Sequence, residues 1–98
     1  MFLSTDPAAM SSAADGLQGI GSAVIAGNCA AAEPTMGVVA PAPEPTSVLM
    51  GLLFATHGGM YQAAAGVAAG WHEMMVAMLG TNSASYAATE AINVAASM

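Results

Sequence analysis

The sequence of 98 residues contains no lysine and no arginine, and its formal net charge at pH 7 is −6. The two histidines are the only side chains that can become positively charged. Without a set of cations the chain cannot neutralise phosphates, which excludes nucleic-acid binding as a main role. It also lacks the lysine of a P-loop and the arginine that clamps a carboxylate or phosphate.

Charge of either sign is scarce. Only 6% of the residues are charged, against about 25% in a typical soluble domain. Hydrophobic residues make up 56% of the chain, and alanine, methionine and leucine favour helices over strands. The composition therefore predicts one all-α domain, residues 1–98, with an apolar surface that needs a cover.

Prolines divide the chain into two helical segments. Four of the five prolines fall at positions 34, 41, 43 and 45, and each one removes a backbone donor and biases its predecessor toward extended geometry. We expect a first helix over about 7–33, a proline-rich loop over about 34–46 and a second helix over about 47–80. A C-terminal segment, 81–98, follows and can form a further helical turn or two.

Both helices have candidate start signals. Asp6 can cap the first helix with Pro7 in its first turn, which is the position where proline is preferred. Thr46 or Ser47 can cap the second helix. Because the loop between them is short, we expect the two helices to run antiparallel as a helical hairpin.

The apolar residues exceed what one hairpin can bury. The first helix shows a single apolar seam, whereas the second helix shows two stripes, rotated from one another around the helix axis. One stripe holds Leu49, Leu53, Met60, Val67, Met74 and Met78, and the other holds Phe54, Tyr61, Ala65, Ala68, Met75 and Leu79. A hairpin has one internal seam, so a partner surface is implied, and which stripe faces inward stays open.

The residues that we expect at the partner interface come from both helices. They are Leu17, Ile20, Val24, Leu53, Met60, Tyr61, Val67, Trp71, Met74 and Met78. Glycines inside a helix each cost about 1 kcal/mol relative to alanine, and close backbone approach is the usual compensation. We expect such approach at Gly16, Gly19, Gly21, Gly58, Gly59, Gly66 and Gly70.

A membrane-spanning helix is the alternative use of this apolar surface. Residues 49–71 carry no Asp, Glu, Lys or Arg and are long enough to span a bilayer. His57, Gln62 and the missing basic flank argue against spanning and favour packing against a partner.

No catalytic or metal-binding constellation is present in the sequence. His72 and Glu73 are adjacent and therefore point in different directions on a helix, and His57 lies fifteen residues away. We expect both imidazoles at a helix interface or its rim. Cys29 is the only cysteine and is expected to be a small apolar side chain, buried or facing a partner. The prediction is a protein that is not an enzyme and has no cofactor.

Five segments, in order and spacing, resemble the mycobacterial PE family. They are 16–23 (GLQGIGSA), 33–39 (EPTMGVV), His57 with 60–62 (MYQ), 72–74 (HEM) and 85–91 (SYAATEA). The resemblance covers nearly the whole chain and is to family members that consist of the PE domain alone. Four features depart from the family pattern. Pro7 is followed by Ala8 instead of glutamate, and the usual acidic residues that open the second helix are replaced around Glu44. The second helix also carries more glycine than expected, and Trp71 is large where small or aliphatic residues are usual.

The resemblance implies a partner and a route of export. PE domains are helical hairpins that complete a four-helix bundle with a PPE-family protein, and an EspG-type chaperone binds the PPE subunit. The pair is exported by a type VII secretion system to the envelope or beyond, and a C-terminal Tyr-x-x-x-Asp/Glu motif contributes to the export signal. That motif corresponds to Tyr86 and Glu90. A membrane-active envelope component that assists small-molecule passage is the alternative function, and a diverged copy that no longer pairs is a third.

Overall fold

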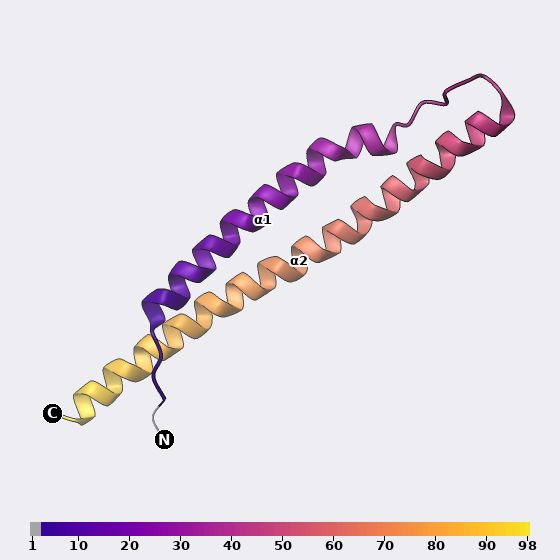
Figure 1. The fold of residues 1–98 in the computed structure, drawn as a ribbon. Coiled ribbons are helices and arrows are strands. Elements are labelled where there is room, and N and C mark those ends of the chain that lie inside the picture. Colours follow the sequence, from indigo (N-terminus) through magenta and orange to yellow (C-terminus); the bar gives the residue numbers. More distant parts are fainter. Residues whose placement is uncertain (1–2) are drawn as a thin grey trace. The chain divides into compact units, whose positions relative to one another are not determined.

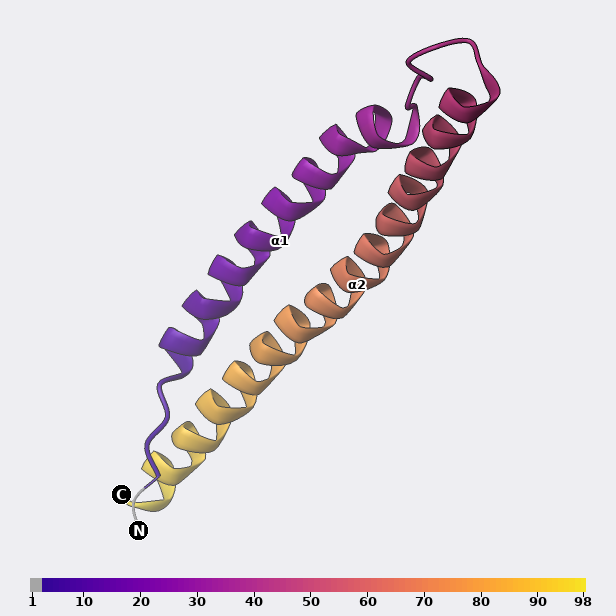
Figure 2. The same cartoon turned by 45° about the vertical axis from the view of Figure 1, so that its right-hand side comes forward.

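In a computed structural model, which describes residues 3–98, the chain forms two α-helices (Figures 1 and 2). Helix α1 is Pro7–Met36 and helix α2 is Pro45–Ala96. No strand occurs in residues 3–98, which confirms the predicted all-helical class. Met1 and Phe2, the first residues of the predicted domain, lie outside the described residues.

The described residues divide into two compact units. Unit 2 is Ser22–Gly70 and forms a helical hairpin from the end of α1, the proline-rich loop and the start of α2 (Figures 1 and 2). Unit 1 comprises the residues up to Gly21 and Trp71–Met98, so it pairs the start of α1 with the second part of α2.

Each helix begins at a proline that directly follows an acidic residue. The Asp6 carboxylate accepts a hydrogen bond from the backbone N–H of Ala9 at 3.0 Å, and α1 begins at Pro7, as predicted. At α2 the cap is Glu44, whose carboxylate accepts hydrogen bonds from the Ser47 N–H at 3.2 Å and hydroxyl at 2.5 Å. The expectation that Thr46 or Ser47 caps α2 is therefore wrong. Pro45 has no N–H to satisfy, and a carboxylate is favoured at the positive end of the helix dipole.

Removal of either cap should weaken its helix. We expect Asp6→Ala and Glu44→Ala each to lower the free energy of unfolding by about 1 kcal/mol, because each leaves a first-turn N–H without its acceptor. Urea titrations followed by circular dichroism measure this effect, with Asp15→Ala, an exposed carboxylate inside α1, as the control. If all three variants lost the same free energy of unfolding, the effect would come from removal of a negative charge and not from loss of the helix cap.

Both helices extend beyond their predicted ends. Helix α1 continues to Met36 although Pro34 lies inside it. In this last turn the Thr35 hydroxyl donates to the Ala31 carbonyl at 2.7 Å, and the Gly37 N–H donates to the Glu33 carbonyl at 2.8 Å. These bonds continue the helical pattern around the donor that proline lacks.

Helix α2 does not stop at residues 80–82 as predicted, but continues to Ala96. A single glycine at position 80 costs about 1 kcal/mol and does not by itself break a helix. The Thr81 hydroxyl donates back to the Ala77 carbonyl at 3.0 Å, and an alanine-rich segment follows. The C-terminal segment is thus an uninterrupted part of α2 instead of a separate short turn.

The face of α2 that packs against α1 is made of small and polar side chains. In unit 2 the buried or half-buried residues of α2 include Gly51, Ala55, Gly58, Gln62, Ala65 and Ala69, and in unit 1 they are His72, Val76, Leu79 and Ser83. Their alternating spacing of four and three residues is that of a helix-packing seam. Neither predicted stripe forms this seam: only Ala65 and Leu79 belong to it, and the larger side chains lie outside.

Hydrogen bonds explain why a polar seam suits this pair of helices. In unit 2 the Gln62 side-chain amide donates to the Asn28 carbonyl at 2.9 Å. In unit 1 the Ser83 hydroxyl donates to the Pro7 carbonyl at 2.6 Å. Side chains reach the backbone of α1 only if the helices approach closely, and small neighbouring residues permit this approach.

Close approach uses two of the seven glycines at which it was expected. A Cβ at Gly58 would lie 2.5 Å from the Thr35 carbonyl oxygen, and a Cβ at Gly21 would lie 2.7 Å from the His72 ring. The expectation is confirmed at these two positions. At the other five glycines the expectation of close approach within the chain is wrong, because a Cβ there would meet nothing within 4 Å. These are Gly16, Gly19, Gly59, Gly66 and Gly70.

Candidate partner-binding site

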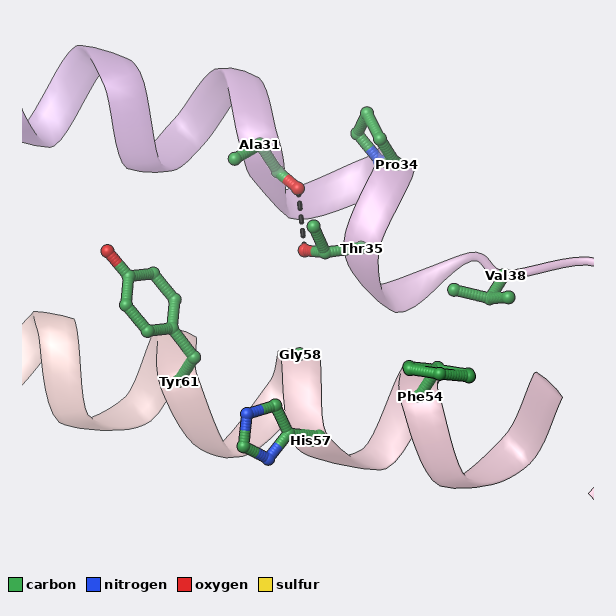
Figure 3. A pocket seen from close by; sticks show the side chains of 8 residues that line it. All are labelled: Ala31, Pro34, Thr35, Val38, Phe54, His57, Gly58 and Tyr61. Carbon is green, nitrogen blue, oxygen red and sulfur yellow. Dashed lines mark hydrogen bonds between the residues drawn. The ribbon is translucent and has the colours of Figure 1, made fainter. Parts of the chain in front are cut away.

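An apolar groove lies between the two helices of unit 2, near the proline-rich loop (Figure 3). Its volume is about 380 Å³. Helix α2 contributes Phe54, His57, Gly58 and Tyr61, and the α1 side contributes Ala31, Pro34, Thr35 and Val38. In Figure 3 the Tyr61 ring rises from α2 toward α1, and the Phe54 ring lies on the other side of Gly58, close to α2 and facing Val38.

A hydrogen bond across the seam fixes one wall of the groove. The Tyr61 hydroxyl donates to the Asn28 Oδ1 at 2.8 Å. At the other end, the missing side chain of Gly58 lets the α1 backbone approach at Thr35. The groove is therefore a formed feature of the hairpin, with aromatic side chains whose apolar bodies remain partly exposed.

The residues that line the groove define one side of each helix, because the residues seven positions before or after them lie on nearly the same side. On α1, Ala31 repeats Val24 and Leu17 at intervals of seven, and Pro34 repeats Ile20 at fourteen. Residues seven apart lie on nearly the same side of a helix, with a drift of about 20° per heptad. We call the rows of α1 and α2 that contain groove-lining residues the groove side of each helix.

On α2 the groove-side rows are defined by two groove-lining residues. Tyr61 shares its row with Phe54 and Met75, and His57 shares its row with Trp71 and Met78. Six of the ten predicted interface residues have this spacing: Val24 and Tyr61 within unit 2, and Leu17, Ile20, Trp71 and Met78 within unit 1. Leu17 is half-buried, and the other five are more than half exposed, up to 69% at Trp71.

The remaining four predicted interface residues form a row on the opposite side of α2 from the seam. They are Leu53, Met60, Val67 and Met74, spaced by seven and 58–67% exposed. Met60 lies two residues from both Gly58 and Gln62, and two residues correspond to about 200° of rotation. We call these four residues the outer row, since their side chains point away from α1.

The predicted export residues lie beyond the part of α2 that α1 covers. Tyr86 and Glu90 continue the seam spacing after Leu79 and Ser83. Ser83 contacts the α1 residue Pro7, where α1 begins, so no helix among the described residues packs on the following turns. Tyr86 is 40% exposed and Glu90 is exposed. This end of α2 therefore carries the two side chains on one face that no helix among residues 3–98 covers.

The two histidines occupy the interface and rim positions that were predicted. The His72 ring is half-buried in the seam, where Nε2 donates to the Leu17 carbonyl at 2.6 Å, and His57 lines the groove. Cys29 is exposed on α1, so it is not buried within the chain, and the expected position facing a partner stays a prediction. Within residues 3–98, no three side chains of histidine, cysteine, aspartate or glutamate gather in a way that could hold a metal ion.

Comparison with known proteins places this helical pair in a family. The sequence pattern of the PE family matches residues 3–93. The chain is 46% identical over 95 residues to PE family protein PE13 of Mycobacterium tuberculosis strain H37Rv, with 97% of this chain and 96% of PE13 covered. The chain belongs to the PE family.

Longer relatives contain the same region. The chain is 49% identical over 82 residues to the PE-PGRS family protein PE_PGRS11 of the same strain, but spans only 14% of it. It is 38% identical over 92 residues to PE family protein PE8 and spans 34% of that protein. Neither helix, in the part of the chain that the structure describes, combines the length and apolar character needed to cross a membrane.

Proposed function

We propose that this chain is a non-enzymatic PE protein that pairs with a PPE-family protein through its groove side and is exported by a type VII secretion system. The observation that carries the proposal is the exposed surface. The chain exposes 7226 Å², whereas a compact monomer of 9.6 kDa exposes about 5,100 Å². Ala14, at 7% exposure, is the only buried apolar side chain among residues 3–98, so a second molecule must supply most of the core.

The groove side suits a partner that contributes two helices. Apolar side chains from both α1 and α2 border it, including Val24 on α1 and Phe54 on α2, both more than half exposed. Two helices laid along these rows would complete a four-helix bundle with the hairpin. A large apolar side chain of the PPE protein would fill the groove between Phe54 and Tyr61, as an anchor residue does in a tight interface.

The export step would use the uncovered end of α2. Tyr86 and Glu90 lie there on one face, and the PPE subunit would supply the rest of a composite signal. An EspG-type chaperone would act on the PPE subunit before export, and the pair would then reach the envelope or the outside. The family membership and the position of these two residues support this proposal.

Pairing through the groove side predicts a large effect of Val24→Glu. Val24 is 54% exposed in the free chain, so the variant should fold, but in the complex it buries a carboxylate without a partner. We expect at least about a hundredfold loss of affinity for the co-expressed PPE protein, which corresponds to about 2.7 kcal/mol. Co-purification and calorimetry measure this loss.

Ala26→Glu is the matched control. Ala26 is exposed on α1, and its row already carries a carboxylate at Glu33, seven residues further on. Pairing should survive this change. A complex that tolerates Val24→Glu but is lost with Ala26→Glu would move the interface away from the groove side.

A further inference from the structure

The outer row of α2 is interleaved with a row of small residues. Three residues after each of Leu53, Met60, Val67 and Met74 come Thr56, Ala63, Gly70 and Ala77, respectively. Residues three apart are neighbours on a helix surface. This face, which we call the outer face, therefore alternates large side chains with small gaps. It lies away from α1. Its small row is about 200° from the Tyr61 row, because Ala63 is two residues from Tyr61, whereas its large row borders the His57 row of the groove side, because Met60 is three residues after His57.

Gly70 is not explained by the hairpin. A Cβ at this position would meet nothing within 4 Å. A glycine inside a helix nevertheless costs about 1 kcal/mol relative to alanine. The hairpin gains nothing in return, whereas a helix that approaches the outer face from outside would use the space above Gly70.

We propose that the outer face of α2 binds the outer face of a second copy of this chain, with the two α2 helices antiparallel. In one register within unit 2, Leu53 meets Gly70 of the second copy, Met60 meets Ala63 and Val67 meets Thr56. Every large side chain then faces a small residue, and two-fold symmetry makes each contact twice. This is the packing of ridges into grooves that brings two helices close together.

Charge allows this pairing although each chain carries a net charge of −6. From residue 45 to residue 70, α2 has no Asp, Glu, Lys or Arg, so the paired faces bring no like charges together. The same absence removes the ion pairs that would select a charged partner or an anionic lipid surface. A second copy needs neither, because the required complement is one of shape.

The exposed area has room for two interfaces. The surface beyond that of a compact monomer is about 2,100 Å², and a standard interface buries about 800 Å² on each partner. A PPE protein on the groove side therefore leaves area for a second contact. Met74, which continues the outer row and is 58% exposed, would extend it.

Cysteine cross-linking tests the pairing independently of the PPE protein. Ala63→Cys is introduced into a Cys29→Ala chain, and a short bis-maleimide is added to cells that express it. In the proposed register the two copies of residue 63 lie within one helical turn of each other, so a covalent dimer of the chain is expected. Absence of the dimer from cells that contain the normal amount of chain would overturn the proposal.

Filling the gap at Gly70 provides the second readout. Gly70→Leu in the same background should lower the yield of cross-linked dimer at least tenfold, although leucine is the better helix former. Gly19→Leu is the matched control, since Gly19 is also an exposed helical glycine with nothing within 4 Å but lies on α1. An equal yield in both variants, or a loss in both, would contradict pairing through the outer face.

The mass of the purified PE–PPE complex separates this inference from the proposed function. Two copies of each chain are expected for the wild type, and one copy of each for Gly70→Leu. A complex with one copy of each at every concentration would overturn the outer-face pairing but leave the PPE pairing intact. Failure to form any PE–PPE complex, together with a cross-linked dimer of this chain, would do the reverse.

Discussion

Replacing Gly58 with alanine should destabilise the hairpin of unit 2, whereas the same change at the adjacent Gly59 should stabilise it. A Cβ at Gly58 would lie 2.5 Å from the carbonyl oxygen of Thr35 and 2.9 Å from its carbonyl carbon. Both are backbone atoms near the end of α1, so relief of the overlap requires a movement of the helix. A Cβ at Gly59 meets nothing within 4 Å.

The two effects have opposite signs and comparable sizes. Overpacking typically costs about 1–3 kcal/mol, and at Gly58 it must exceed the gain of about 1 kcal/mol that alanine brings in helix propensity. At Gly59 only that gain remains. We expect the free energy of unfolding of Gly58→Ala to be about 2–3 kcal/mol below that of Gly59→Ala. Gly58→Val should be less stable than both.

Thermal unfolding followed at 222 nm measures the difference. For a chain of this length, 1 kcal/mol corresponds to about 4–8 °C in Tm. Gly58→Ala should therefore melt at least about 8 °C below Gly59→Ala. Equal melting temperatures would show that α1 does not pack on Gly58, and the groove beside it would lose its basis.

Local signals predicted the helices better than their ends. Asp6 followed by Pro7 correctly marked the start of α1. Glu44 followed by Pro45 is the same arrangement, yet glutamate is not among the usual capping residues, so the start of α2 was misplaced. Gly80 suggested a stop, but α2 continues because no proline follows and alanine is abundant.

Hydrophobicity alone misdirects the choice of the internal face. In an isolated domain the largest apolar side chains face the core, so the two stripes of α2 were the natural candidates for the seam. In this chain the helix pair uses Gly58, Gln62 and His72 for its own contact and leaves Met60 and Trp71 outside. The seam could have been found in the sequence from the alternating four- and three-residue spacing of the small and polar residues. A search by hydrophobicity ignores these residues.

The groove could not be derived from the sequence. Its walls join Val38 of the loop to Phe54 and Tyr61 of α2, and their proximity depends on the path of the loop. That path is set partly by close packing of residues 38 and 40 over Gly51, where a Cβ would lie 3.5 Å from the Ala40 nitrogen. No local pattern encodes such a contact between loop and helix.

Replacing Tyr86 with alanine should abolish export and leave pairing with the PPE protein intact. Tyr86 follows the turn of α2 at which Ser83 contacts Pro7, the first residue of α1, is 40% exposed, and is not part of the groove side. Removal of its ring therefore takes away a recognition element but none of the contacts proposed for the PPE subunit. We expect the PE–PPE complex to accumulate inside the cell, with less than about one tenth of the wild-type amount outside.

Glu90 and a nearby control residue sharpen this test. Glu90 lies one turn after Tyr86 on the same face, and its carboxylate is exposed. Glu90→Gln should reduce export and Glu90→Asp should preserve it, because the proposed signal needs the negative charge at this position and not the full length of the glutamate side chain. Ile92→Ala removes a side chain that is 68% exposed in the same stretch of α2 and should leave export unchanged.

Two outcomes would contradict the export signal as proposed. If Ile92→Ala blocks export as strongly as Tyr86→Ala, the machinery recognises the apolar end of the helix as a whole, and the two-residue signal is wrong. If the complex itself is lost in Tyr86→Ala, the end of α2 belongs to the PPE interface, because only a contact with that subunit links the ring to pairing.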